Sequence, residues 1–181
     1  MKTQTIFFLV CLLFTVSCKE TITGPSSGTN LLTNSTFEWN GIPSLHGWIV
    51  LDTAGVQFST DVPSGGSGRS IIVHPSWLPT WPIGIVYQTI PAFVGTHRYL
   101  ISVFGKKNGV SGGVRVGLSQ PQGIQWKGGI GVPDTAWTFY SSVDTITAGS
   151  GDSIIVAIST GACEICLGTT YLNTCKLEKL D

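Results

Sequence analysis

The sequence has few charged residues and no excess of either sign. Lys and Arg number 10, Asp and Glu number 10, and together they make up 11% of the 181 residues. Nucleic-acid binding needs a basic patch, so this class of function is not indicated. Amphipathic helical periodicity of useful length is also missing, whereas Gly is abundant, with 23 residues. This composition favours a β-rich domain outside the cytoplasm.

Sequence motifs for catalysis are missing as well. The three His residues form no metal-binding pattern, and no nucleophile elbow, Walker loop or dinucleotide fingerprint is present. The Gly-rich stretch at residues 64–68 lies between predicted strands and does not precede a helix, which argues against phosphate binding. Glycoside hydrolysis needs two carboxylates that face one cleft. The sequence pairs none of its acidic residues in this way, so we expect no enzymatic activity.

The N-terminus carries a targeting segment. Lys2 supplies a positive charge, and residues 6–16 form an almost unbroken apolar run. A transmembrane helix takes roughly 20 apolar residues, so this run is too short to span a bilayer. Small residues then precede Cys18 and resemble a bacterial lipobox, although Thr15 stands where Leu is usual. The alternative is ordinary signal-peptide cleavage after Ser17.

We therefore predict a lipoprotein signal peptide over residues 1–17 and a lipid-anchored Cys18 with a flexible tether over residues 18–29. The small, polar stretch TITGPSSGT at residues 21–29 is typical of a flexible linker. Both cleavage alternatives export the protein, and in the first the lipid provides the membrane affinity. Lys19 is not the Asp that retains enterobacterial lipoproteins at the inner membrane, which favours the outer membrane or cell surface.

Residues 30–181 are predicted to form one antiparallel β-sandwich or barrel. Short apolar runs alternate with polar residues and are separated by Gly, Pro, Asn and Asp. Alternation places Tyr99, Ile101 and Val103 on one face of their strand. It does the same for the strand that carries Val114, Val116 and Leu118. The predicted strands are residues 48–51, 56–60, 70–74, 85–90, 99–105, 114–119, 138–146, 153–159 and 171–177.

An ordered set of short motifs carries a resemblance to a known family. The set comprises Asn30-Leu31-Leu32, Asn34, Phe37-Glu38, Gly47-Trp48, Gln88-Thr89-Ile90-Pro91, residues 95–104, residues 137–140 and residues 171–177. In this order they resemble the carbohydrate-binding modules of the CenC-like group, which have a galactose-binding-like jelly-roll fold. The resemblance covers nearly the whole domain and implies non-catalytic binding of carbohydrate. It is more specific for fold than for ligand.

Six Trp residues supply the candidate binding platform. Trp48 and Trp137 match structural positions of the resembled family and are assigned to the core, and Trp39 is assigned to local packing. The remaining three are assigned to loops or to edges of the sandwich, and exposed aromatic rings are typical of binding surfaces. We predict that sugar rings stack on Trp77, Trp81 and Trp126, with His74, Gln88 or Gln125 bonding sugar hydroxyls. The alternative is that these Trp side chains cover the open ends of the sandwich.

The resemblance also implies one metal site, a structural Ca²⁺ held by Glu38 and the last strand. Asn173 and Thr174 stand where the family often has two Asp residues, which weakens this site. The alternative is that Glu38 hydrogen-bonds the backbone of the closing strand. No other cofactor is expected.

Three Cys residues remain after Cys11 and Cys18, an odd number for an oxidising compartment. The Cys163-x-x-Cys166 pair lacks the context of a redox motif or a full set of zinc ligands. Cys175 is expected to be a buried, inert thiol. We predict a Cys163–Cys166 disulfide, with Cys166–Cys175 as the alternative.

The sequence thus predicts an exported lipoprotein that holds a polysaccharide or glycan at the cell envelope without cleaving it. The alternative is a structural or adhesive envelope lipoprotein whose sandwich contacts another protein through aromatic anchors.

Overall fold

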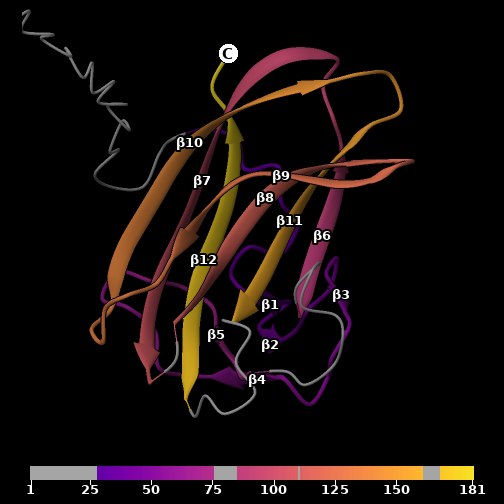
Figure 1. Cartoon of the computed structure of the whole chain (residues 1–181). Coiled ribbons are helices and arrows are strands. Elements are labelled where there is room, and N and C mark those ends of the chain that lie inside the picture. Colours follow the sequence, from indigo (N-terminus) through magenta and orange to yellow (C-terminus); the bar gives the residue numbers. More distant parts are fainter. Residues whose placement is uncertain (1–27, 76–84, 110, 161–167) are drawn as a thin grey trace, which may run out of the picture.

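The chain folds into two packed antiparallel sheets of five strands each (Figure 1). The computed structural model describes residues 28–75, 85–109, 111–160 and 168–181. We name the sheets by their central strands: the β12 sheet has the order β10-β7-β12-β5-β4, and the β11 sheet has the order β3-β6-β11-β8-β9. Within the described ranges no helix is long and apolar enough to cross a membrane.

The strands are β1 (Glu38–Trp39), β2 (Ile42–Pro43), β3 (Ile49–Val50), β4 (Val56–Ser59), β5 (Ser70–Val73), β6 (Val86–Pro91), β7 (Gly95–Asn108), β8 (Gly112–Gln120), β9 (Gly123–Gly131), β10 (Thr138–Ala148), β11 (Ser153–Thr160) and β12 (Thr169–Lys179). All nine predicted strands are confirmed. The short β1 and β2 pair with each other outside the two large sheets. The sequence analysis missed β1, β2 and β9.

Side-chain alternation builds the core between the sheets. Tyr99, Ile101 and Val103 of β7 are at most 1% exposed, and so are Val114, Val116 and Leu118 of β8. Both predicted apolar faces are therefore confirmed as inner faces. Each fully buried aliphatic side chain contributes about 1.5–3 kcal/mol of hydrophobic stabilisation, so this face-to-face packing is the main driving force for the fold.

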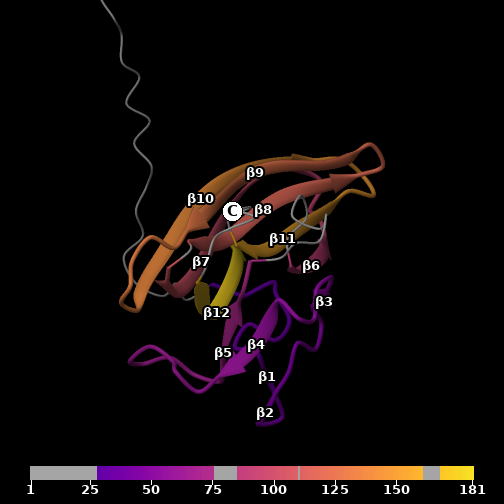
Figure 2. The same cartoon turned by 60° about the horizontal axis from the view of Figure 1, so that its bottom comes forward.

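The edge strands β9 and β10 belong to different sheets but lie side by side (Figure 2). Gly128 of β9 permits this approach, because a Cβ at that position would lie 2.2 Å from the carboxylate of Asp144 on β10. A side chain at this position would require the Asp144 carboxylate to move. The two sheets are thus brought together along this side of the sandwich.

The opening motif fastens the N-terminal segment to the closing strand. Asn30 Oδ1 accepts hydrogen bonds from the backbone N–H groups of Leu32 and Leu177. Asn34 has a φ of 52°, in the left-handed region that Asn tolerates. Its side chain donates to the carbonyl of Ser44 and accepts from the N–H of Glu38. These bonds satisfy backbone groups that no strand ladder pairs.

The two Trp residues assigned to the core behave differently. Trp48 is only 6% exposed and packs on the fully buried Phe37, with ring centroids 5.7 Å apart, as predicted. The prediction for Trp137 is wrong, because this residue lies outside the core cluster and is half-buried. Its indole N–H donates to Asp61 Oδ1 at 2.9 Å, a contact that holds the ring on the outer side of the β12 sheet.

Candidate functional site

The outer face of the β11 sheet is the first candidate surface. Strand register places Tyr87 of β6, Ala157 of β11, Arg115 of β8 and Gly129 of β9 in one row across it. Their neighbours Val86, Val114 and Val156 are buried in the core, so these four residues point away from the core, although Ala157 in the middle of the row is itself fully buried. Three strand spacings of roughly 4.8 Å separate β6 from β9, so the row spans about 14 Å.

A hollow of about 360 Å³ lies at one end of this face. We call it the glycine hollow, and its lining includes Gly113, Arg115, Gly129, Gly131, Ser159 and Thr160. A Cβ at Gly129 would lie 2.6 Å from the carbonyl oxygen of Val114, so a side chain is excluded there. A Cβ at Gly131 would meet no atom within 4 Å. The hollow exists because paired positions on β8 and β9 carry no side chains.

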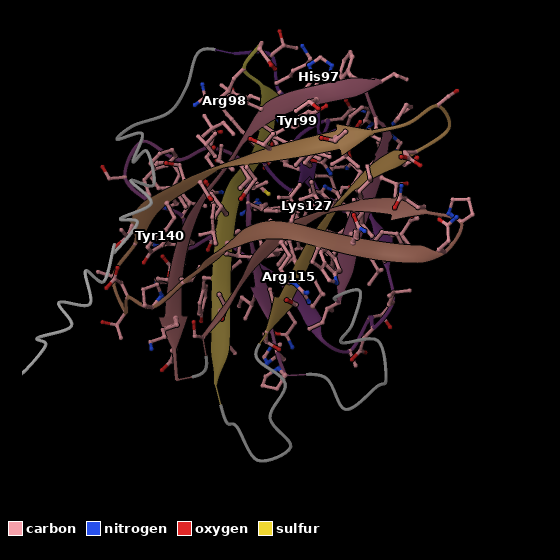
Figure 3. The ribbon with its side chains drawn as sticks, turned by 45° about the horizontal axis from the view of Figure 1, so that its top comes forward. His97, Arg98, Tyr99, Arg115, Lys127 and Tyr140 are labelled. Atoms are coloured by element: carbon pink, nitrogen blue, oxygen red, sulfur yellow. The ribbon has the colours of Figure 1, made fainter. Side chains whose placement is uncertain are left out.

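Trp126 and Arg115 form one unit beside the glycine hollow. The Arg115 guanidinium carbon lies 3.9 Å from the centroid of the Trp126 ring, a close cation–π contact. Trp126 pairs with Gly117, where a Cβ would lie 3.0 Å from the indole ring. The absence of a side chain at Gly117 therefore leaves room for the indole on this face. Figure 3 labels Arg115 and Lys127 on the neighbouring strands β8 and β9.

The structure brings only part of the predicted sugar site to this surface. Trp126 lies in β9, an edge strand that the sequence analysis did not predict, and its indole is partly exposed. Gln125 is exposed on the same strand, but it pairs with the inward-facing Leu118 and so lies on the other face of β9 from Trp126; its Oε1 accepts a hydrogen bond from Lys127 Nζ at 2.8 Å. Trp77 and Trp81 lie outside the described residues, so their predicted role stays a prediction.

The other two predicted polar ligands occupy different environments. Gln88 is 4% exposed, and its amide bonds both the N–H and the carbonyl of Thr33. It therefore anchors the N-terminal segment, which corrects its prediction as a sugar ligand. His74 follows β5 and is half-buried; its carbonyl accepts from Thr160 Oγ1 at 3.3 Å, and its Nε2 is buried without a hydrogen-bond partner.

Two residues of this surface were missed in the sequence analysis, Tyr87 and Arg115. The signal was available, since Arg115 is the one charge in the run Val114-Arg-Val-Gly-Leu118 and is out of phase with its apolar members. Partial burial lowers the pKa of Arg115 from its ordinary value, because desolvation disfavours the cation.

A second polar cluster lies on the outer face of the β12 sheet. Lys106 Nζ lies 4.8 Å from the Tyr171 ring centroid and 5.2 Å from that of Trp137, and it forms an ion pair with Asp61. Hydrogen bonds from Lys106 and Trp137 lower the pKa of Asp61. A hollow of about 270 Å³ adjoins it, lined in part by Lys107. Lys106 and Asp61 neutralise each other in this cluster, so we interpret it as a structural packing element.

The residues predicted to hold Ca²⁺ do not fit that ion. Glu38 Oε2 lies 3.6 Å from Arg69 Nε, so a protein cation already faces the carboxylate. Asn173 is fully buried, and its Nδ2 donates to the carbonyls of Ser67 and Arg69 at 2.9 Å each. Calcium needs oxygen ligands, whereas an amide nitrogen points at these two carbonyls. Among the described residues no group of three or more His, Cys, Asp and Glu side chains could hold a metal.

Cys175 is a free, fully buried thiol, as predicted, and burial raises its pKa to about 12. The alternative Cys166–Cys175 disulfide is therefore not formed in this structure. Cys163 and Cys166 lie outside the described residues, as does Cys18.

Comparison with known proteins gives the fold. No family model and no curated protein matches the sequence. The enzymatically active domain of bacteriophage CBA120 tailspike protein 4 matches over 83% of this chain with a TM-score of 0.58 and 18% identity, but this chain covers only 21% of it.

Two carbohydrate-binding modules match over nearly their whole length. The CBM22-1 xylan-binding domain of Paenibacillus barcinonensis Xyn10C has a TM-score of 0.55 and 13% identity, covering 87% of this chain and 99% of its own. TmCBM61, solved with β-1,4-galactotriose, has a TM-score of 0.53 and 16% identity, covering 84% and 99%. The chain therefore has the jelly-roll sandwich fold of carbohydrate-binding modules, which confirms the predicted fold class.

Proposed function

We propose that this protein binds a polysaccharide or glycan, without cleaving it, on the outer face of the β11 sheet. The observation that carries the proposal is the glycine hollow beside Trp126, because sugar-binding needs an open recess next to an exposed aromatic ring. Tyr87 offers a second ring on the same face, one row of the sheet away. The two full-length fold neighbours that bind xylan or galactotriose support the proposal.

The lining of the hollow argues for binding and against hydrolysis. Its described residues include hydroxyl groups from Ser159 and Thr160 and one cation, Arg115, but no carboxylate. A glycosidase needs two carboxylates about 5–10 Å apart across the scissile bond. The proposed activity is therefore recognition alone.

We propose further that the protein acts at the cell envelope, held by a lipid on Cys18 through the tether of residues 18–29. This part of the proposal rests on the sequence alone. Mass spectrometry of the N-terminal peptide from the native host tests it: a diacylated Cys18 is expected, and a peptide that begins at Cys18 without lipid would contradict it.

Binding to a broad panel of immobilised polysaccharides tests the main proposal, using the full chain in mild detergent. We expect saturable binding to at least one polysaccharide. Trp126→Ala should weaken it about tenfold or more, since one aromatic stacking contact is worth about 1–2 kcal/mol. Gly131→Leu should also block binding, because its side chain would project into the hollow without meeting protein atoms.

Phe58→Ala is the matched control, because Phe58 is a 40% exposed aromatic residue on β4 of the other sheet. It should leave binding unchanged. A Trp77→Ala/Trp81→Ala variant tests the two predicted Trp residues that the structure does not describe. The proposal fails if no polysaccharide binds, or if the folded Trp126→Ala and Gly131→Leu variants bind as well as the wild type.

One observation supports the protein-contact alternative. The β1–β2 hairpin presents Trp39 and Ile42 with 44% and 66% of their surfaces exposed, and large exposed apolar residues anchor protein interfaces. The Trp39 ring lies against His46, with ring centroids 4.2 Å apart, and this contact supports the orientation of the exposed ring. Cross-linking in whole cells that is lost in a Trp39→Ala variant, without any glycan binding, would favour this function.

A further inference from the structure

Arg115 is partly buried and has an aromatic ring, not a polar side chain, as its partner among the described residues. Other basic side chains have a polar side-chain partner: Arg69 with Glu38, Lys106 with Asp61, Lys127 with Gln125, and Lys179 with Asp181. Within the described ranges Arg115 has neither an ion pair nor a hydrogen bond from its guanidinium, and its one recorded contact is the Trp126 ring. A partly buried cation without an anion is unfavourable, because water no longer solvates it fully.

The geometry leaves the guanidinium available to a ligand. The recorded contact places the guanidinium carbon over the Trp126 ring, whereas the N–H donors of this planar group lie along its edges. Arg115 also lines the glycine hollow, whose described lining carries no acidic side chain. A carboxylate or sulfate bound where the hollow adjoins Trp126 would therefore meet a planar fork of donors, and the described lining of the hollow holds no competing anion.

We propose that the glycan bound on this face is acidic, with a carboxylate or sulfate of the polysaccharide paired to Arg115 in the glycine hollow. This inference rests on the proposed function and adds the class of ligand. The sugar ring that carries the acidic group would lie near Trp126. Arg115 would then recognise the charge and Trp126 the ring. A neutral polysaccharide would leave the guanidinium unpaired and should bind more weakly.

The experiment compares two polymers that differ mainly in charge, polygalacturonate and its fully methyl-esterified form, with a sulfated galactan as a third ligand. Affinity is measured with the full chain, its Arg115→Gln variant and its Arg115→Lys variant. We expect the wild type to prefer one of the acidic polymers by about tenfold or more, the range for a charge-assisted hydrogen bond. Arg115→Gln should remove the preference, and Arg115→Lys should retain part of it because the charge stays and the fork is lost.

Lys107→Gln is the matched control. Lys107 lines the other hollow, on the β12 sheet, and this substitution also removes one positive charge. It should keep the preference for the acidic polymer. If the wild type binds polygalacturonate and the sulfated galactan no more tightly than the esterified polymer, the proposed function is left standing and this inference is overturned. Equal losses in Arg115→Gln and Lys107→Gln would also overturn it, as the signature of unspecific charge attraction. Absence of binding to every polysaccharide would overturn both, and thermal melting of each variant establishes that it is folded.

Discussion

The Asn173 amide occupies the position where a bound cation would lie. Replacing this amide by a carboxylate tests whether it excludes the cation. In the wild type its Nδ2 donates to the carbonyls of Ser67 and Arg69 from a fully buried side chain. Asn173→Asp at pH 7 would replace those two donors by an acceptor that faces both carbonyl oxygens. It keeps the size of the side chain, so the change isolates the polar interaction.

The expected magnitude follows from the two lost hydrogen bonds and the buried charge. Each unsatisfied buried group costs about 1–3 kcal/mol, and an uncompensated buried charge about 3–5 kcal/mol. We expect a loss of about 3–5 kcal/mol in the free energy of unfolding, which lowers Tm by roughly 10 °C for a domain of this size. Millimolar Ca²⁺ should restore part of this loss, because the new carboxylate and the two carbonyls are oxygen ligands.

Thermal melting with Ca²⁺ and with EDTA provides the assay. The wild type should give the same Tm in both buffers, whereas Asn173→Asp should melt lower and respond to Ca²⁺. Asn108→Asp is the control for the charge change, since Asn108 is exposed at the end of β7. A wild-type Tm that falls by several degrees in EDTA would refute the reasoning, and so would an Asn173→Asp variant as stable as the wild type.

Three further results are expected. The pKa of Asp61 is lowered in the folded state, so its contribution to stability is present above the unfolded value near 3.8 and is lost as pH falls through the folded value. Asp61→Asn should therefore make the free energy of unfolding depend less on pH in acid. At pH 7 the effect should be at most about 1 kcal/mol, because the ion pair with Lys106 is exposed. Gly113→Ala should destabilise the protein by about 1–3 kcal/mol in chemical denaturation, because its Cβ would lie 2.0 Å from the backbone carbonyl oxygen of Ile130, whereas Gly131→Ala should change little. Cys175, as a fully buried thiol with a pKa of about 12, should react with a thiol reagent only in denaturant; rapid reaction of this residue in the native protein would contradict the described packing.

The inner faces of the strands were predictable because burial imposes a period of two on the sequence. The run of Val114, Val116 and Leu118 has this period and could belong to no other element. Strand β9 was missed for the opposite reason. Its sequence, GIQWKGGIG, holds four glycines and lies opposite a register shift between Val116 and Gly117, so it has neither strand propensity nor regular alternation. Pairing with β8 stabilises this strand, and this pairing cannot be recognised from the sequence of β9 alone.

The candidate site could be predicted only in part, because strand register decides which distant residues share a face. Trp126 was chosen for its residue type, whereas Arg115 becomes its neighbour only through the bulged β8–β9 pairing. The metal prediction shows the same limit. Glu38 matches the family motif, yet the neighbour that neutralises it, Arg69, lies 31 positions later and belongs to no motif.

The sequence analysis chose Gln88 as a surface residue and missed its neighbour Tyr87, although side-chain alternation alone would have predicted the opposite. In Val86-Tyr87-Gln88 the apolar Val86 faces the core, so alternation turns Tyr87 outward and Gln88 inward. Residue type suggested the reverse, because a glutamine is usually at the surface. The inward glutamine is tolerated since both atoms of its amide bond the backbone of Thr33, which closes the N-terminal segment over the sheet edge. In this fold a polar residue in phase with the core therefore marks an anchoring point of the chain. A large or charged residue out of phase with the core, such as Tyr87 or Arg115, lies on the outer face, where the proposed binding surface is.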